Sequence, residues 1–578
     1  GWDELPPARR RQVAAWLQVL MTAYPGNKLV VAGPVRGYRP LQEIGLAPVF
    51  LMPWSASEFA ELGRLWAAAW PEIGGTPREP ALEPEPDLVR LAIRGNRSRS
   101  PLDATLKLWA TFAGDDPGEG RQGWYSAYVN RIIPAPELRG ALEQAAEMIL
   151  SSEEEAIGLS IAEFTRLVDQ AREESGGRTV RTPDFIYTIT NETHLLTEHP
   201  GKRLSFTQPV IGAYLAAEAL REAPFREELL ARESFNTLVM PFLSQMQDVT
   251  PYVQRLLGEG NTILKEDWLY LAAWATDASL KAPWRGEAFK RMAQLLLAPV
   301  QFPLTRERAM AALVASRDLN VGFVFRQGLK SQDPRIRILA ALGLGALGDP
   351  ETVIALGEAL NDENPAVEAA AAMALGAMGT RTALNYMIQT LLTGSELGRR
   401  AVAEMLATNI AGEGHDILRE ALEEQDPATR RAAIYGLELV NEEWAIKLLE
   451  NAERRDDQWI VRAAAANALE ALRSPNGNAP RRPPQPTEIR WLIDWLAERD
   501  ESVAPGPSGI SQLVRALQEG DERIRLAAAE TLGALAAPEG VTPLYTALRD
   551  EHPEIRDSAY RSLGTISQAS GHKLPGVL

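Results

Sequence analysis

A helical unit recurs along the second half of the chain at a fixed spacing. The clearest copy begins at Asp333-Pro334 and ends at Leu360. Aspartate is a good helix N-cap, and proline suits the first helical position because the N–H that it lacks would have no partner there. Apolar residues follow at helical spacing until Gly348-Asp349-Pro350 breaks the helix, and a second apolar run completes the unit. The pattern predicts two helices joined by a tight turn.

Copies of this unit hold the same register over most of the second half. The residue equivalent to Pro334 is, in order, Pro303, Pro334, Pro365, Glu396, Pro427 and Gln458, and after an interruption Glu522 and Pro553. Neighbouring members of each run are 31 residues apart (365 − 334 = 31). Because neither helix can bury its apolar stripe alone, the copies must stack, and so even a period is typical of a solenoid.

Each unit resembles a HEAT repeat of the short bacterial type. The shared features are a proline at the first helix start, an Arg or Val shortly after it, and an alanine-rich helix ending in Leu-Gly-x-Leu/Met-Gly, as at 344–348 and 375–379. The resemblance implies an α-α HEAT-repeat solenoid over residues 302–578 that binds a protein ligand on its concave face. A proline-rich insertion at 474–487 interrupts it and is either part of a binding face or a plain linker.

Composition narrows the class of protein. A chain of 578 residues is too long for one core. It contains no cysteine, which excludes disulfides, thiolate zinc sites and a thiol nucleophile and fits a reducing, cytoplasmic setting. No run is long and apolar enough to suggest a membrane span. The formal net charge of −17 argues against a nucleic-acid partner, which would need a dense basic face.

The first six residues, Gly1-Trp2-Asp3-Glu4-Leu5-Pro6, resemble the end of a Walker B element of the NACHT type. The resemblance implies that Asp3 helps to hold Mg²⁺ through its water shell and that Glu4 orients the attacking water. The alternative is a solvated acidic pair at a helix start. Since the strand and first aspartate of the motif are missing and no initiator methionine is present, we expect a fragment of a longer protein.

The order of the next segments is also similar to NACHT domains. A helix is expected over Pro7–Tyr24, a short apolar strand over Lys28–Gly33, and another apolar strand from Val49. Pro34 stands where the family has its sensor arginine, and Arg36 is the nearest guanidinium. Arg36 therefore either contacts the nucleotide in its place or is a surface arginine.

Two further residues stand at positions where that family contacts the nucleotide. Pro101 opens a helix similar to the small helical lid, where the family's proline packs against adenine; it would equally suit a helix start. Gln208 precedes Tyr214-Leu215-Ala216-Ala217, which resembles the end of the family's winged-helix domain, and it occupies the place of a phosphate-contacting histidine. A hairpin is expected to turn at Pro200-Gly201.

We therefore expect a mainly α chain in which a truncated α/β NTPase remnant, a helical lid and a winged-helix-like domain precede the solenoid. The expected boundaries are the C-terminal part of a NACHT NTPase domain at 1–75, a small helical lid at 76–135, a winged-helix-like domain at 136–235, a helical transition at 236–301 and HEAT repeats at 302–578.

The resemblance implies a signal-transducing STAND-type NTPase, with a role in defence signalling, whose repeat arm controls an ATP/ADP-dependent switch. The intact parent would use ATP or ADP with Mg²⁺ and form a homo-oligomer when active. This chain has no Gly-x-x-x-x-Gly-Lys-Ser/Thr to hold phosphates, so neither tight nucleotide binding nor ATPase activity is expected of it alone. The alternative is a non-catalytic HEAT-repeat interaction scaffold, favoured by Pro34 and Gln208. A third interpretation is a HEAT-like bilin lyase. The chain has no cysteine and no cluster of acids on a predicted concave face, and both absences argue against this interpretation.

Overall fold

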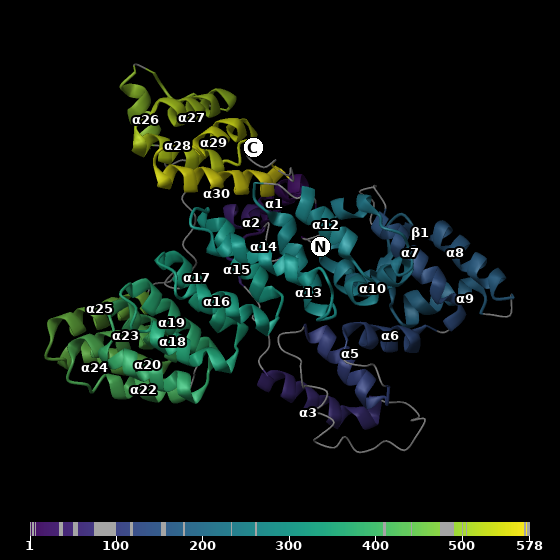
Figure 1. Cartoon of the computed structure of the whole chain (residues 1–578), viewed down its shortest axis with the longest axis horizontal. Coiled ribbons are helices and arrows are strands. Elements are labelled where there is room, and N and C mark those ends of the chain that lie inside the picture. The colour runs from purple at the N-terminus through teal and green to yellow at the C-terminus, as the bar shows by residue number, and fades with distance from the viewer. Residues whose placement is uncertain are drawn as a thin grey trace. The chain divides into compact units, whose positions relative to one another are not determined.

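The structure is a computed structural model. It describes residues 2, 5, 7–33, 38–49, 56–73, 100–115, 120–133, 135–151, 158–176, 180–232, 234–259, 263–408, 412–440, 442–473, 490–499, 501–504, 506–570 and 574. The chain forms two compact units, one of Gly1–Phe50, Asn261–Glu266 and Phe289–Leu578, the other of Leu51–Gly260 and Asp267–Ala288. Helices dominate both, as expected (Figure 1).

The repeats of the first unit consist of paired helices. The first helices are α15 (Pro303–Ala315), α17 (Pro334–Leu347), α19 (Pro365–Met378), α21 (Glu396–Thr408), α23 (Pro427–Val440) and α25 (Trp459–Arg473). The second helices are α16 (Gly322–Gly328), α18 (Val353–Ala359), α20 (Arg381–Thr393), α22 (Glu413–Ala421) and α24 (Glu443–Arg455). The predicted helix starts are confirmed except at Gln458, since α25 begins one residue later.

A second run of helices follows the proline-rich insertion. It comprises α26 (Arg490–Ala497), α27 (Pro507–Glu519), α28 (Glu522–Ala534), α29 (Val541–Ala547) and α30 (Pro553–Ser570). The predicted starts at Glu522 and Pro553 are confirmed. In this run α28 and α30 occupy the places of first helices.

Local sequence explains where the first helices begin and end. The Asp333 side chain accepts a hydrogen bond from the N–H of Arg335 at 2.9 Å, which caps α17. Gly348 ends the same helix in the left-handed conformation, with φ at 64°. Asn364 and Gly379 do the same for α19. The cap residues therefore fix the helix length of these two repeats.

Small residues let the first helices approach one another closely. A Cβ added to Gly345 of α17 would lie 2.5 Å from Ala374 Cα of α19, and one added to Gly376 would lie 2.8 Å from Met405 Cβ of α21. Each second helix of the first run packs on the first helix of the next repeat, and α20, α22 and α24 also pack closely on their own first helices. The first helices thus form a continuous layer, which we call the first-helix layer.

Arginines join each repeat to the next through the fourth residue of the first helix. Arg337 donates to both carboxylate oxygens of Asp362 at 2.8 Å, and two more pairs have the same two-bond geometry. Those pairs are Arg430–Asp456 at 2.8 Å and Arg525–Asp550 at 3.0 Å. Arg306 bonds Asp333 through a single nitrogen at 2.7 Å. Arg399 pairs with Asp426. Glu368 replaces the arginine once and accepts the Ser395 N–H at 2.8 Å.

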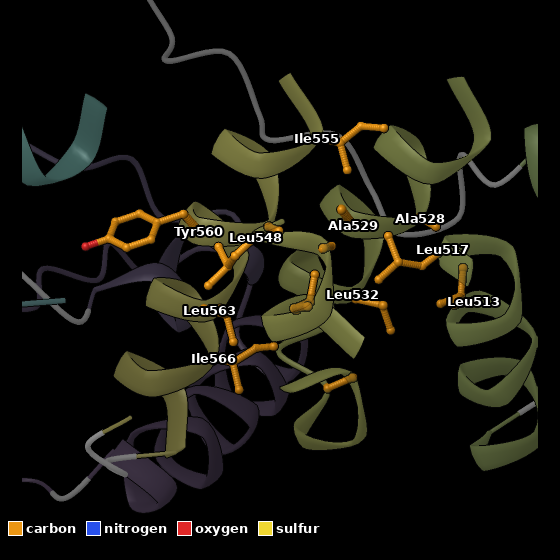
Figure 2. Close-up of a cluster of buried hydrophobic side chains, with 14 of the residues drawn as sticks. Leu513, Leu517, Ala528, Ala529, Leu532, Leu548, Ile555, Tyr560, Leu563 and Ile566 are labelled. Carbon is orange, nitrogen blue, oxygen red and sulfur yellow. The ribbon is translucent and has the colours of Figure 1, made fainter. Parts of the chain in front are cut away.

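The two runs of repeats are joined in an order that differs from the chain order. The last first helix, α30, packs against α15, the start of the first run, and not after α25 (Figure 1). The junction buries Tyr560, which stacks on Phe302 and bonds Thr305. The core of the second run lies beside it, with Leu517, Leu532 and Leu563 inside (Figure 2). The expected solenoid exists, but in space the C-terminal run of helices lies against α15, at the start of the N-terminal run.

The N-terminal segment of the first unit contains α1 (Pro7–Ala23) and α2 (Arg39–Glu43), and the helix expected over Pro7–Tyr24 is confirmed. Leu17 and Leu41 share a small core with Trp2. The strand expected over Lys28–Gly33 is wrong for the described structure, which pairs this segment with no strand and leaves Val30 92% exposed. A strand requires a hydrogen-bonded neighbour, and the described residues offer none here. They likewise contain no parallel sheet.

The second unit is helical with one small sheet. Its elements are α3 (Ala56–Ile73), α5 (Pro101–Phe112), α6 (Arg121–Ile132), α7 (Arg139–Ser151), β1 (Leu159–Ser160), α8 (Ile161–Glu174), α9 (Thr182–Tyr187), β2 (Leu196–His199), β3 (Arg203–Phe206), α10 (Pro209–Leu220), α11 (Met240–Met246), α12 (Thr250–Glu259) and α13 (Glu266–Asp277). Helix α14 (Arg285–Leu297) crosses the boundary between the units.

The sheet contains the predicted hairpin. Strands β2 and β3 pair antiparallel with Leu196 opposite Phe206, the chain turns at Pro200-Gly201, and β1 pairs with the other edge of β3. Gly201 has a φ of 88°, which glycine adopts without strain. From α7 to β3 the element order is helix, strand, two helices and two strands. The winged-helix interpretation of this segment stays a prediction.

Candidate protein-binding face of the repeat array

One side of the first-helix layer is not covered by second helices, and we call it the first-helix face. In α17 the second, fifth and ninth residues, Arg335, Ile338 and Leu342, are exposed or half-buried, whereas Ile336 and Leu344 of the same helix are buried. The 31-residue period places the corresponding residues of every repeat on this same face. Three cavities of the array are lined by such residues.

Apolar side chains occupy the middle of this face. Ile338 and Leu342 of α17 are half-buried, while Met373 of α19 is 46% exposed and Leu397 of α21 is 52% exposed. We call these four residues the apolar strip. Apolar side chains that reach the surface on three successive helices of one face are typical of an interaction surface.

Beyond α21 the face becomes aromatic and rich in arginine. The Arg400 guanidinium lies 4.7 Å from the centre of the Tyr435 ring, and Arg431 pairs with Glu396 at 2.6 Å. A cavity of about 140 Å³ opens between α21 and α23 beside these residues. Trp459 at the start of α25 is 71% exposed. Tyrosine, tryptophan and arginine are the residues that most often dominate binding energy at interfaces.

On the other side of the apolar strip the face contains larger cavities. One of about 300 Å³ lies between α30, α15 and α17 and is lined by Glu307, Arg335, Ile338 and Asp557 among others. Burial raises the pKa of Asp557 although Arg335, 3.9 Å away, and Arg561 act in the opposite direction. This cavity exists only because α30 packs beside α15.

Three of the five predicted site residues lie outside the described residues. They are Asp3, Glu4 and Arg36, so their predicted roles toward Mg²⁺ and nucleotide stay predictions. In the part of the chain that the structure describes, no group of three or more His, Cys, Asp or Glu is placed to hold a metal ion.

Pro101 and Gln208 are both described, and both are exposed. Pro101 is the first residue of α5, where Ser100 and Asp103 form a reciprocal capping box. Gln208 is the N-cap residue of α10, without a side-chain cap hydrogen bond. Nothing among the described contacts joins the two residues. The helix-start role accounts for Pro101, and the predicted adenine contact stays untested.

A buried charge network adjoins this helix start, and the sequence reasoning missed it. Asp103 is 5% exposed and accepts hydrogen bonds from Arg121 at 2.8 Å and Tyr125 at 2.9 Å. Burial acts to raise the pKa of Asp103, but the Arg121 charge and the hydrogen bonds from Arg121 and Tyr125 together outweigh burial and lower the pKa. Burial also raises the pKa of Tyr125. Arg121 lies 3.7 Å from Asp277 as well, so the network ties α5, α6 and α13 together.

Comparison with known families decides the nature of the array. A family model of HEAT repeats matches residues 324–407, 391–470, 415–505 and 510–573. The array is built of HEAT repeats. Of the helices in the described part of the chain, none combines the length and apolar composition needed to span a membrane. No curated protein matches the sequence.

Several solved structures share a likeness with the chain. Human deoxyhypusine hydroxylase in complex with glycerol is 20% identical over 49% of this chain and 96% of that one, with a TM-score of 0.24. The CpcE–CpcF complex of phycocyanin lyase from Nostoc sp. PCC7120 is 21% identical over 43% and 94%, with a TM-score of 0.20. An engineered protein is 16% identical over 74% and 99%, also with a TM-score of 0.20. At these TM-scores the likenesses carry no functional argument.

Proposed function

We propose that this chain is a non-catalytic interaction scaffold whose HEAT repeats bind a segment of a partner protein along the first-helix face. The observation that supports the proposal is the apolar strip, which exposes Met373 and Leu397 at the centre of that face. Repeat arrays characteristically present such extended surfaces to their partners. The sequence alone favoured an ATP/ADP-dependent NTPase switch. The family comparison supports the HEAT repeats and not the NTPase resemblance, so we place the scaffold first.

The second-helix side provides a matched control. Ile354 of α18 is 63% exposed, more than either Met373 or Leu397, but it lies on a second helix. A charge introduced at Ile354 thus tests whether any exposed apolar residue of the array binds, or only those of the first-helix face.

The test is a selection of peptides from a phage-displayed library on the full chain. We expect enriched peptides with apolar residues that bind the wild type and the Ile354→Asp variant alike. The double variant Met373→Asp, Leu397→Asp should weaken their binding by about tenfold or more, since burying an unpaired charge costs more than the lost contact. Circular dichroism must show that all variants are folded. Enriched peptides that bind the double variant as tightly as the wild type would contradict the proposal.

A nucleotide-controlled switch, in which the repeat arm regulates an ATP- or ADP-binding NACHT-type parent that oligomerises, is a second proposal. The element order from α7 to β3, which is that of a winged helix, supports it. Its test is the binding of fluorescent ADP with Mg²⁺ to a longer protein that includes a Walker A motif. Binding that is unchanged by Gln208→Ala and Arg36→Ala would remove these residues from the proposed nucleotide site.

A further inference from the structure

The first run of repeats ends at α25, and one side of this helix is open. Helix α25 packs on α23 and α24, and among the described residues no further helix continues the first-helix layer beyond it (Figure 1). In the inner repeats that side is the stacking interface. Gly345 and Gly376, the twelfth residues of α17 and α19, face the first helix of the next repeat there. The corresponding side of α25 is therefore an interface without its second half.

Five residues of α25 share this side, and we call them the end stripe. They are the first, fourth, eighth, twelfth and fifteenth residues of the helix, which line up because they are three or four positions apart. In order they are Trp459, Arg462, Ala466, Glu470 and Arg473. Trp459 is 71% exposed. Ala466 is half-buried, whereas the eighth residues of α17, α19 and α21 (Ala341, Ala372 and Ala403) are 0% exposed. The next repeat covers those alanines, and Ala466 lacks this cover.

Arg462 has the position of the repeat-joining arginines but not their acid. Arg337 and Arg430 donate from Nη1 to two backbone carbonyls, and from Nε and Nη2 to the aspartate that precedes the next first helix. Arg462 makes the same two carbonyl bonds from Nη1, at 2.7 Å and 3.1 Å, but no carboxylate of the described residues bonds its Nε or Nη2. Arg556 has the same arrangement in α30. An arginine of this kind without an acid therefore marks the end of a run.

The end stripe is complementary to itself when two copies of α25 lie antiparallel. A twofold axis at Ala466 brings together residues that are equally far from it on opposite sides. Arg462 and Glu470 are such a pair (466 − 462 = 470 − 466 = 4), and so are Trp459 and Arg473 (466 − 459 = 473 − 466 = 7). Glu470 is exposed and forms no ion pair with the described residues. The stripe thus provides an acid for Arg462, a cation for the tryptophan ring and a small residue where the helices cross.

We propose that two copies of this chain form a symmetric dimer through the end stripes of α25. Each contact of such an interface occurs twice. Glu470 of each copy accepts charge-assisted hydrogen bonds from Arg462 of the other. The Arg473 side chain, which is 66% exposed beside Glu450, lies against the Trp459 ring of the other copy. The dimer goes beyond the scaffold function, because the end stripe and the first-helix face are different sides of the array, and it gives the scaffold two such faces.

Sedimentation velocity of the full chain tests the dimer. Because an interface of one helix pair is small, the measurement covers concentrations from about 1 to about 200 µM. We expect a concentration-dependent species with twice the mass of one chain and nothing larger. Glu470→Arg places an arginine opposite Arg462 in both pairs and should weaken the dimer about tenfold or more. The matched control Glu358→Arg makes the same change of charge on an exposed residue of α18 and should change the dissociation constant less than about twofold.

Two further variants test the antiparallel geometry. Arg462→Glu combined with Glu470→Arg exchanges the two charges and should restore the dimer, because the ion pair forms again across the axis. Ala466→Cys introduces the only cysteine of the chain, on the axis, and should give a disulfide-linked dimer with copper–phenanthroline, whereas Glu358→Cys should not.

Four results would overturn the proposal. They are a chain that stays monomeric at every concentration, assemblies larger than two chains, a dimer that Glu470→Arg does not weaken, and equal cross-linking of the two cysteine variants. Circular dichroism establishes that each variant is folded.

Discussion

The ring of Tyr560 stacks on the ring of Phe302, with centroids 4.2 Å apart and planes 8° apart, although 258 positions separate the two residues (560 − 302 = 258). The Tyr560 hydroxyl donates to the Ile263 carbonyl at 2.7 Å and lies 2.6 Å from Thr305 Oγ1. This contact joins the two runs of repeats into one first-helix layer. The cavities on both sides of α30 depend on it.

Removing that hydroxyl should weaken the junction. Tyr560→Phe keeps the stacking but loses both hydrogen bonds, leaving a buried carbonyl without its donor, and should lower the free energy of unfolding by about 1–3 kcal/mol. Urea denaturation followed by circular dichroism measures the change. Tyr435→Phe is the control, because no hydrogen bond of its hydroxyl is described, and it should change stability little. Equal effects of the two substitutions would mean that the junction contributes nothing specific.

The arginine–aspartate pairs should matter more than exposed ion pairs. Arg337 is 9% exposed at its side chain and bonds Asp362 with both nitrogens of its fork, so Arg337→Ala should cost about 2–4 kcal/mol of stability. Arg419 pairs with Asp416 on the surface, where its side chain is 45% exposed, and Arg419→Ala should cost less than about 1 kcal/mol. A loss no larger at Arg337 than at Arg419 would contradict the structural role given to these pairs.

The same pairs predict a loss of stability in acid. Burial acts to raise the pKa of Asp362, but the hydrogen bonds from Arg337 and the Asn364 N–H outweigh it and hold the pKa below its ordinary value. The unfolded chain then binds more protons than the folded one, so stability is present above about pH 4 and falls as the pH drops below it. Asp456 and Asp550 shift in the same direction.

Stability measured by urea titration between pH 6 and pH 3 checks this dependence. Asp362→Asn removes one titrating group and should make the loss of stability with falling pH less steep. An unchanged slope would show that Asp362 does not contribute.

The close approach of the first helices can be tested at a single glycine. Gly345→Ala places a Cβ within 3 Å of the Ala374 backbone and should destabilise the array by about 1–3 kcal/mol. Gly140→Ala, where no atom lies within 4 Å of the added Cβ, should be neutral or stabilising by up to about 1 kcal/mol. Differential scanning fluorimetry of both variants measures these changes in stability. A neutral Gly345→Ala would mean that the helices are farther apart than described.

Much of the repeat architecture was predictable because its causes are local. Asp333 and Pro334 start a helix, and Gly348 ends it, whatever the rest of the chain does. The apolar spacing then requires stacking, and the 31-residue period supplies the copies. Even the hairpin at Pro200-Gly201 follows from local turn chemistry.

The order of the repeats in space was not predictable in this way. The 31-residue period is the same in both runs, so it does not determine whether α30 follows α25 or precedes α15. That choice depends on contacts between distant residues, such as Tyr560 with Phe302, which leave no periodic signal. The pairing of Asp103 with Arg121 is non-local in the same sense.

Apart from the helix over Pro7–Tyr24, the N-terminal predictions failed or stayed open for a different physical reason. Lys28–Gly33 has the composition of a strand, but a strand forms only against a partner, and Val30 faces water in the described structure. Asp3, Glu4 and Arg36 have functions that depend on neighbours which their sequence positions alone do not specify. The order of the motifs identified these three residues as candidates, but it could not predict which other residues surround them.

Hydrogen–deuterium exchange of the full chain with and without a library-selected peptide tests the central claim most directly. The account predicts slower exchange of amides in α17, α19 and α21 when the peptide is bound, with α18, α20 and α22 unchanged. Protection confined to the second helices, or to the second unit, would contradict a scaffold that binds through its first-helix face.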